Sequence, residues 1–256
     1  MRAFLDKPED SYQKQKLKNR FVEALALEYV AGNDITDELS TILPFDMNLD
    51  SDSLIQARSG FPGGNTGGIN SVFYLLEEIW GYGCWCYFGE EYGSGRGSPV
   101  NEMDADCQAL GLCYQCIEMD LKEEGKDNCF PGMEQYNRPV RRDSSLEGAL
   151  IACAEENEGD NCKIYTCTCE TTFVNKLIRN FFNGIQFDPT PKHSLGFNPS
   201  VECPGSGGNH EKQCCGTYPS RTPYGINTRA CCEPAGKTYN PSLYECCDDG
   251  SLKISC

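Results

Sequence analysis

Hydrophobic residues recur at helical spacing near the beginning of the chain. Residues 13–31 would carry one apolar stripe along a helix, made by Leu17, Phe21, Leu25 and Tyr29, and Gly32 and Asn33 follow as a stop. This pattern predicts an amphipathic helix within an N-terminal arm of residues 1–69. Either the stripe folds back on the chain's own core, or it docks on a second copy and builds a head-to-tail array.

Two longer helices are predicted further along. Residues 101–124 are rich in helix formers, contain Gly111 as their one internal glycine, and end at Gly125. A second helix is predicted over 161–183, before Gly184. Between them, the prolines, glycines and short apolar stretch of residues 131–153 predict loops with a short hairpin. The expected fold class is therefore mainly α.

Cysteine is the most informative residue in the composition. The chain has 18 cysteines in 256 residues and 2 histidines, and an even number at this density indicates disulfides formed in an oxidising compartment. Zinc is the alternative, but Cys113 and Cys116 form a lone C-x-x-C pair with no second half-site. We expect a disulfide-rich, secreted, extracellular protein without metal or cofactor.

The last part of the chain has a different texture. After a proline-containing linker at 186–202, residues 203–256 hold eight cysteines, six of them in the adjacent pairs 214/215, 231/232 and 246/247. Adjacent Cα atoms are about 3.8 Å apart, below the usual disulfide range of about 4.4 to 6.8 Å. Each of these cysteines should therefore bond elsewhere, in a small cysteine-rich module whose connectivity the sequence leaves open.

The net charge of −16 makes the chain strongly acidic, and most of the acidic excess lies within residues 84–173. Such a field disfavours nucleic acid as a partner and favours cations, basic proteins or a cationic mineral face, although it also simply keeps a secreted protein soluble. No apolar run is long enough to span a bilayer. The beginning of the sequence lacks an apolar leader, so we expect a mature form.

A motif in the middle of the chain resembles a known family. Tyr82-Gly-Cys-Trp-Cys86 is followed by Gly95-Arg-Gly-Ser-Pro-Val-Asn-Glu-Met-Asp104 and Cys107-Gln-Ala-Leu-Gly-Leu-Cys-Tyr114. This order resembles the calcium loop and first long helix of secreted phospholipase A2. Cys153, Cys162, Cys167, Cys169 and Glu170 resemble that family's last long helix. The resemblance covers residues 70–185 and implies antiparallel long helices with a small β hairpin.

The chain departs from the family pattern where the family carries its chemistry. The positions of the histidine that activates water and the aspartate that holds calcium are Leu110 and Gly111. Leucine cannot accept a proton, and glycine offers no carboxylate to a hard cation. We therefore expect a pseudoenzyme with no catalytic and no metal-binding residues, in which Tyr114 and Glu170 survive as structural groups.

The resemblance also implies a set of disulfides. The implied pairs are Cys86 with Cys107, Cys113 with Cys169, Cys129 with Cys162, and Cys153 with Cys167. Cys84 and Cys116 lack their usual family partners and are expected to pair with each other. Asp106 stands where the family has a cysteine, whose usual partner falls at Lys176. These two residues either form an ion pair in place of the disulfide or are unrelated surface charges.

The C-terminal module resembles the di-cysteine repeats of galaxin-like matrix proteins, and otoconins similarly combine phospholipase A2-like modules with mineral. The first hypothesis is therefore a non-enzymatic, self-assembling structural protein of an extracellular matrix. Its expected partners are further copies in an oligomer or filament, other matrix proteins, or a calcium carbonate surface in biomineralisation. The alternative is a secreted lipid- or receptor-binding protein without hydrolytic activity. An active lipase is the third hypothesis.

Overall fold

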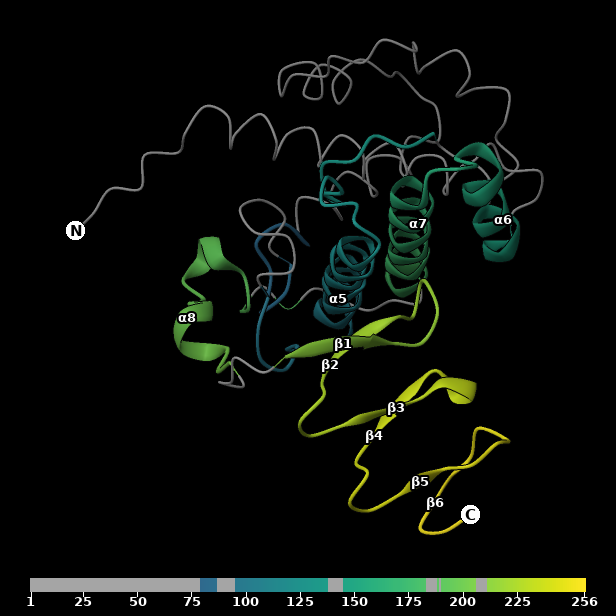
Figure 1. Cartoon of the computed structure of the whole chain (residues 1–256). Coiled ribbons are helices and arrows are strands. Elements are labelled where there is room, and N and C mark those ends of the chain that lie inside the picture. The colour runs from purple at the N-terminus through teal and green to yellow at the C-terminus, as the bar shows by residue number, and fades with distance from the viewer. Residues whose placement is uncertain (1–78, 87–94, 138–144, 183–187, 189, 206–210) are drawn as a thin grey trace.

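The structure is a computed structural model of the whole chain, and it describes residues 79–86, 95–137, 145–182, 188, 190–205 and 211–256 (Figure 1). The N-terminal arm lies outside these residues. The predicted apolar stripe of Leu17, Phe21, Leu25 and Tyr29 therefore stays a prediction. Within the described residues, no helix combines the length and the apolar character needed to cross a membrane.

Two long helices form the centre of the described structure. Helix α5 spans Glu102–Glu123 and helix α7 spans Asn161–Phe182, close to the bounds that the sequence predicts. The side chain of Asn101 caps α5 by accepting a hydrogen bond from the backbone N–H of Asp104. The two helices lie side by side (Figure 1). Their facing apolar side chains form the core and include Ile117, Leu121, Val174 and Leu177, each fully buried.

Residues 146–156 form a helix, so the prediction of loops with a hairpin over 131–153 is wrong for this stretch. Helix α6 spans Leu146–Glu156, and the Ser145 hydroxyl caps it by accepting from the N–H of Gly148. Its buried residues are Ala149, Ala152 and Cys153, which recur at spacings of three and four. These are small side chains, so they give a weak apolar signal in the sequence although they let α6 pack closely on α7.

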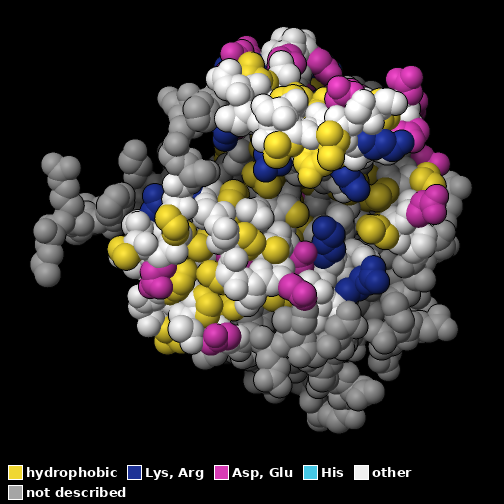
Figure 2. All heavy atoms as spheres, turned by 90° about the horizontal axis from the view of Figure 1, so that it is seen from below, with side chains coloured by type: hydrophobic (Ala, Val, Ile, Leu, Met, Phe, Trp, Pro, Cys, Tyr) yellow, Lys and Arg dark blue, Asp and Glu magenta, His cyan; other side chains and the backbone are white. Residues whose placement is uncertain are grey.

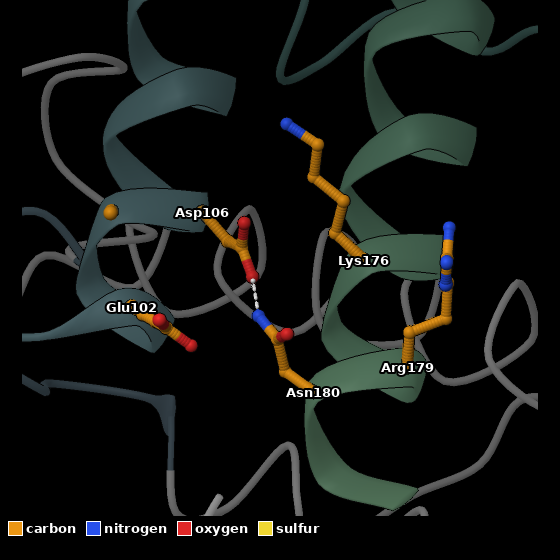
Figure 3. Close-up of a pocket in the computed structure, with 6 residues that line it drawn as sticks. Glu102, Asp106, Lys176, Arg179 and Asn180 are labelled. Carbon is orange, nitrogen blue, oxygen red and sulfur yellow. Dashed lines mark hydrogen bonds between the residues drawn. The ribbon is translucent and has the colours of Figure 1, made fainter. Parts of the chain in front are cut away.

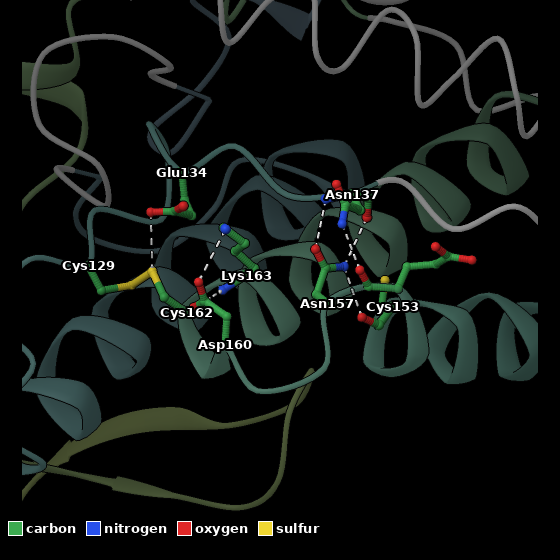
Figure 4. Close-up of polar contacts among 9 residues, drawn as sticks. Cys129, Glu134, Asn137, Cys153, Asn157, Asp160, Cys162 and Lys163 are labelled. Carbon is green, nitrogen blue, oxygen red and sulfur yellow. Dashed lines mark hydrogen bonds and ion pairs between the residues drawn. A yellow bond between two sulfur atoms is a disulfide. The ribbon is translucent and has the colours of Figure 1, made fainter.

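Reciprocal hydrogen bonds fasten the end of α6 to the preceding loop (Figure 4). Asn157 is 4% exposed, its Oδ1 accepts from the N–H of Asn137 at 2.7 Å, and its Nδ2 donates to the Asn137 carbonyl at 2.9 Å. The same Nδ2 donates to the carbonyl of Cys153 at 3.0 Å. The buried amide of Asn157 thus forms hydrogen bonds with backbone groups of both segments, and its own polar atoms are satisfied as well.

Three short antiparallel hairpins follow the helices. The first pairs β1 (Lys212–Cys215) with β2 (Thr222–Gly225), the second pairs β3 (Ala230–Cys232) with β4 (Lys237–Tyr239), and the third pairs β5 (Glu245–Cys246) with β6 (Leu252–Lys253). Short helices precede and join them: η1 (His193–Leu195), α8 (Pro199–Glu202) and η2 (Glu233–Ala235). Figure 1 shows the hairpins descending in steps from α5 and α7.

Disulfides connect these steps in sequence. Cys116 on α5 is joined to Cys214, Cys215 to Cys231, Cys232 to Cys246, and Cys247 to Cys256. In each adjacent pair, one cysteine bonds backward and the other forward. We call this series the disulfide ladder. The adjacent cysteines, which cannot bond to each other, therefore each form a disulfide with a cysteine elsewhere in the chain.

The remaining disulfides agree with the implied pairs except at Cys84 and Cys116. The structure joins Cys86 to Cys107, Cys113 to Cys169, Cys129 to Cys162 and Cys153 to Cys167, which are the pairs that the family resemblance implies. The expected pairing of Cys84 with Cys116 is wrong. Cys84 bonds to Cys203, and Cys116 bonds to Cys214. Both bonds join the helical part to the C-terminal part, because the first hairpin packs against α5 and brings Cys214 to it.

A polar cluster adds to the covalent links at this contact. Asp120 on α5 accepts two hydrogen bonds from the Arg221 guanidinium, from Nε at 2.5 Å and from Nη2 at 3.0 Å, and one from the Tyr218 hydroxyl at 2.8 Å. The Tyr218 ring stacks on Tyr165 of α7, with centroids 4.2 Å apart. We call Asp120, Tyr218 and Arg221 the hairpin clamp. Burial and its hydrogen bond to Asp120 raise the pKa of Tyr218 above its usual value.

Candidate functional site

The residues that resemble a calcium loop are held from one side by a buried carboxylate. Asp104, near the beginning of α5, is fully buried. It accepts hydrogen bonds from the backbone N–H groups of Cys84, Trp85 and Val100 at 2.8 to 2.9 Å. Burial raises the pKa of Asp104, and these backbone hydrogen bonds oppose the rise. A Cβ at Gly83 would lie 2.4 Å from the Asp104 carboxyl carbon, so only glycine fits there.

A second segment also packs against this loop. Residues 191–203 run from Pro191 to Cys203, and Lys192 forms an isolated β bridge with Tyr82. The N–H of Gly83 donates to the Pro191 carbonyl at 2.9 Å, and the Cys84–Cys203 disulfide closes the contact. We call residues 81–86 the loop and residues 191–203 the strap. The loop thus has contacts with both Asp104 and the strap.

Leu110 and Gly111 lie on the buried side of α5. Leu110 is 2% exposed and belongs to the hydrophobic core, and Gly111 is also buried. Glu170 and two tyrosines form one hydrogen-bond network. The Glu170 side chain is fully buried, and its carboxylate accepts from the Tyr114 hydroxyl at 2.5 Å and from the Tyr136 hydroxyl at 2.7 Å. Two tyrosine hydroxyls therefore satisfy the two carboxylate oxygens.

The described residues do not fit the calcium ion that the family resemblance implies. Calcium takes six to eight oxygen ligands, several of them carboxylates. Gly111 offers no side-chain oxygen, and the Asp104 carboxylate is already occupied by three N–H groups. Among the residues described, no cluster of three or more histidine, cysteine, aspartate or glutamate side chains could hold a metal.

Asp106 and Lys176 line a hollow between the beginning of α5 and the end of α7, together with Glu102, Ala105, Arg179 and Asn180 (Figure 3). Asp106 is 9% exposed, and its Oδ2 accepts from the Asn180 amide at 2.6 Å. Figure 3 shows the Lys176 side chain extending away from Asp106, so the direct partner is Asn180 rather than Lys176. Burial raises the pKa of Asp106 to about 6, although the positive charge of Lys176 and the Asn180 hydrogen bond oppose the rise.

This raised pKa predicts that Asp106 makes the fold less stable as the pH rises. The folded pKa of about 6 exceeds the unfolded value of about 3.9, so stability is lost between these two pH values, by about 2 to 3 kcal/mol in total. The variant Asp106→Asn should therefore be more stable than the natural chain at neutral pH. Guanidinium unfolding between about pH 4 and pH 7 measures this.

The exposed Asp127 provides a matched control for this measurement. Asp127→Asn should leave the pH dependence of the natural chain intact, whereas Asp106→Asn should flatten it. Identical pH slopes for the natural chain and Asp106→Asn would contradict the prediction.

Several residues that organise these sites escaped the sequence interpretation. His193, whose Nε2 lies 2.9 Å from the Gly83 carbonyl oxygen, stands out in the sequence only as one of two histidines. Tyr136, Asp120 and Arg221 carry no signal of their own there. Their partners lie between 34 and 110 residues away in the sequence. No local spacing could have identified them, because each contact depends on how the strap or the first hairpin packs on α5 and α7.

Comparison with known proteins identifies relatives that match a little under half of the chain. The chain is 33% identical over 131 residues to a "Group IIF secretory phospholipase A2" of Mus musculus, spanning 66% of that protein and 48% of this chain. It is 33% identical over 111 residues to the "Basic phospholipase A2 nigroxin A" of Micrurus nigrocinctus, spanning 78% of that protein and 43% of this chain. It is also 26% identical to the "Neutral phospholipase A2 homolog taipoxin beta chain 2" of Oxyuranus scutellatus scutellatus, over 76% of that protein and 43% of this chain.

No protein-family profile matches the chain, and no solved structure matches it. The relatives nevertheless correct one expectation. They are named as phospholipases A2, which favours an enzyme and contradicts the expectation, drawn from Leu110 and Gly111, that the chain is not one. With 33% identity across most of the length of nigroxin A, the chain belongs to the phospholipase A2 family.

Proposed function

We propose that this chain is a secreted member of the phospholipase A2 family that serves as a cross-linked structural unit of an extracellular assembly. Secretion is supported by the density of disulfides, which form and persist in oxidising compartments, and by a relative named as secretory. The structural role is supported by the way in which the helical part and the hairpins are joined.

The observation that carries this proposal is a continuous covalent path through the molecule. All 18 cysteines form nine disulfides, and no cysteine is free. Two of these bonds join the helical part to the C-terminal part, and three continue along the disulfide ladder. Such a unit keeps its shape under conditions that would unfold a non-covalent fold, because cross-links remove conformational freedom from the unfolded chain.

The far end of the disulfide ladder offers a contact surface for assembly. Leu243, Tyr244 and Ile254 are 60%, 45% and 84% exposed there. Covering such side chains stabilises a contact between proteins. Figure 2 looks at the molecule from below, the side on which Figure 1 draws the last hairpins, and shows hydrophobic side chains gathered on part of this face, with acidic side chains spread around its margin. We infer that the apolar end of the ladder contacts a further copy of the chain.

Sedimentation of the purified chain over a range of concentrations tests this proposal. The natural chain should associate as its concentration rises, and Leu243→Ser with Ile254→Ser should weaken association at least tenfold, since about 1.4 kcal/mol of lost burial gives a factor of about 10. The control is Val201→Ser, because Val201 is also exposed, at 74%, but lies on α8. A natural chain that stays monomeric at every concentration would refute the proposal.

A second candidate is action on phospholipid, because the relatives are named as phospholipases A2. Adding phospholipid vesicles to the same sedimentation samples, with and without calcium, separates the two. Release of fatty acid above the level of vesicles without protein would establish this second function.

A further inference from the structure

The nine disulfides differ in how far their cysteines are exposed to solvent. All 18 cysteines lie in the part of the chain that the structure describes. Cys231 and Cys246 are partly buried, Cys256 is exposed, and all the others are buried. Cys256 is bonded to Cys247, which is 8% exposed. The Cys247–Cys256 bond is therefore the one disulfide with an exposed residue at one end.

The ring that this bond closes is small and is held by few contacts. Its two cysteines are nine residues apart, the shortest separation among the nine disulfides. The last hairpin pairs strands of only two residues each, β5 and β6. A cross-link that closes a short ring constrains the unfolded chain least. Opening this disulfide should therefore disturb the fold less than opening any other.

Acidic side chains surround the exposed end of this bond. Oε2 of Glu245 accepts a hydrogen bond from the N–H of Cys256 at 3.2 Å. Asp248 and Asp249 lie within the ring, and both are exposed. The one basic residue of this hairpin is Lys253, whose Nζ lies 3.8 Å from Asp249. The acidic charge exceeds the basic charge, so the site attracts a positively charged reagent and repels a negatively charged one.

We propose that the Cys247–Cys256 disulfide is a site of exchange with small thiols, and that it reacts most readily with cationic ones. The thiolate attacks Sγ of Cys256, the exposed partner, and forms a new S–S bond there. The old S–S bond breaks, its electron pair stays on Sγ of Cys247, and that sulfur takes a proton from water. The incoming thiol is thereby oxidised to a mixed disulfide, and the original disulfide is reduced. This reaction does not depend on whether copies of the chain assemble.

Timed treatment of the full chain with cysteamine, followed by acid quenching, alkylation and peptide mapping, tests where exchange occurs. The chain is kept at a concentration at which it sediments as a monomer. Cys247 and Cys256 should react at least about tenfold faster than the cysteines of any other disulfide, because buried disulfides must first be exposed by local unfolding. The cysteamine adduct should form on Cys256 and the free thiol on Cys247. Equally fast reaction of another disulfide, or an adduct on Cys247 instead, would overturn the proposal.

Comparison of three thiols tests the preference for positive charge. The rates of cysteamine, mercaptoethanol and thioglycolate are each divided by the rate of the same thiol with a small uncharged disulfide, which removes differences in intrinsic reactivity. These relative rates should fall about five- to tenfold from the cationic to the anionic thiol at low salt, and converge at about 1 M salt.

Charge-neutralising variants identify the source of this preference. Asp248→Asn with Asp249→Asn should reduce the ratio between the cationic and the anionic thiol at least about twofold. The matched control, Asp127→Asn with Glu158→Gln, removes two exposed acidic charges from the helical part and should leave the ratio unchanged. Equal relative rates for the three thiols at low salt, or the same ratio in both double variants, would overturn the proposed preference.

Discussion

Replacing both Cys84 and Cys203 by serine is expected to lower the free energy of unfolding by about 3 kcal/mol. The bond spans 119 residues of sequence, and a loop of that length alone would predict a cost of nearly 5 kcal/mol. The Cys86–Cys107 and Cys116–Cys214 bonds remain, however, and they shorten the chain path between the two positions to about 25 residues. The expected loss of unfolding free energy is therefore about 3 kcal/mol rather than nearly 5 kcal/mol.

Guanidinium unfolding of the oxidised double variant measures this change, after peptide mapping confirms the other eight disulfides. The matched control replaces Cys247 and Cys256, which close only nine residues at the end of the disulfide ladder. That variant should unfold locally at its last hairpin and leave the main transition unchanged. If the variant without Cys84 and Cys203 unfolded at the same guanidinium concentration as the natural chain, this bond would not stabilise the fold.

The variant Asp120→Ala should destabilise the chain by about 3 kcal/mol. Asp120 and Arg221 expose only 19% and 23% of their side chains. Removing the carboxylate leaves the guanidinium without its bidentate partner and the Tyr218 hydroxyl without its acceptor. Uncompensated polar groups at a half-buried contact cost more than the loss of an exposed ion pair.

Chemical unfolding at neutral pH measures this prediction, with Lys126→Ala as the control. Lys126 and Glu124 form an exposed ion pair on the same part of the chain, and its loss should cost less than about 1 kcal/mol. Combining Asp120→Ala with Arg221→Met should cost less than the sum of the single changes, because both remove the same interaction. Simple additivity would mean that the hairpin clamp contributes no coupling.

The sequence predicted the elements whose signals are local. Helices α5 and α7 follow from long runs of helix formers and from Gly125 and Gly184 beyond their ends. Helix α6 was missed because its buried face consists of alanine and cysteine rather than large apolar residues, and because glycines and prolines precede it. Tertiary packing against α7, not a strong local pattern, accounts for α6.

The errors at the candidate sites come from contacts between distant parts of the chain. Cys84 and Cys116 were expected to pair because both lack their usual family partners. No local sequence pattern shows that the first hairpin brings Cys214 to α5. The possible ion pair of Asp106 with Lys176 was inferred from the positions of a cysteine pair in the family. The direct partner, Asn180, lies one helical turn further along α7. A small change of alignment between two packed helices is enough to replace one partner by the other.

The disulfide ladder has a mechanical consequence. If the chain were pulled at Cys256, force would pass through three disulfides with Cα–Cα distances of 5.4 to 5.6 Å and three peptide steps of about 3.8 Å. The residues inside each closed ring would carry no load. Residues 214–256 could then stretch to about 28 Å with the disulfides intact, against about 140 Å after reduction. With its disulfides intact, the C-terminal part can therefore lengthen very little under load, and reducing them would increase its reach about fivefold.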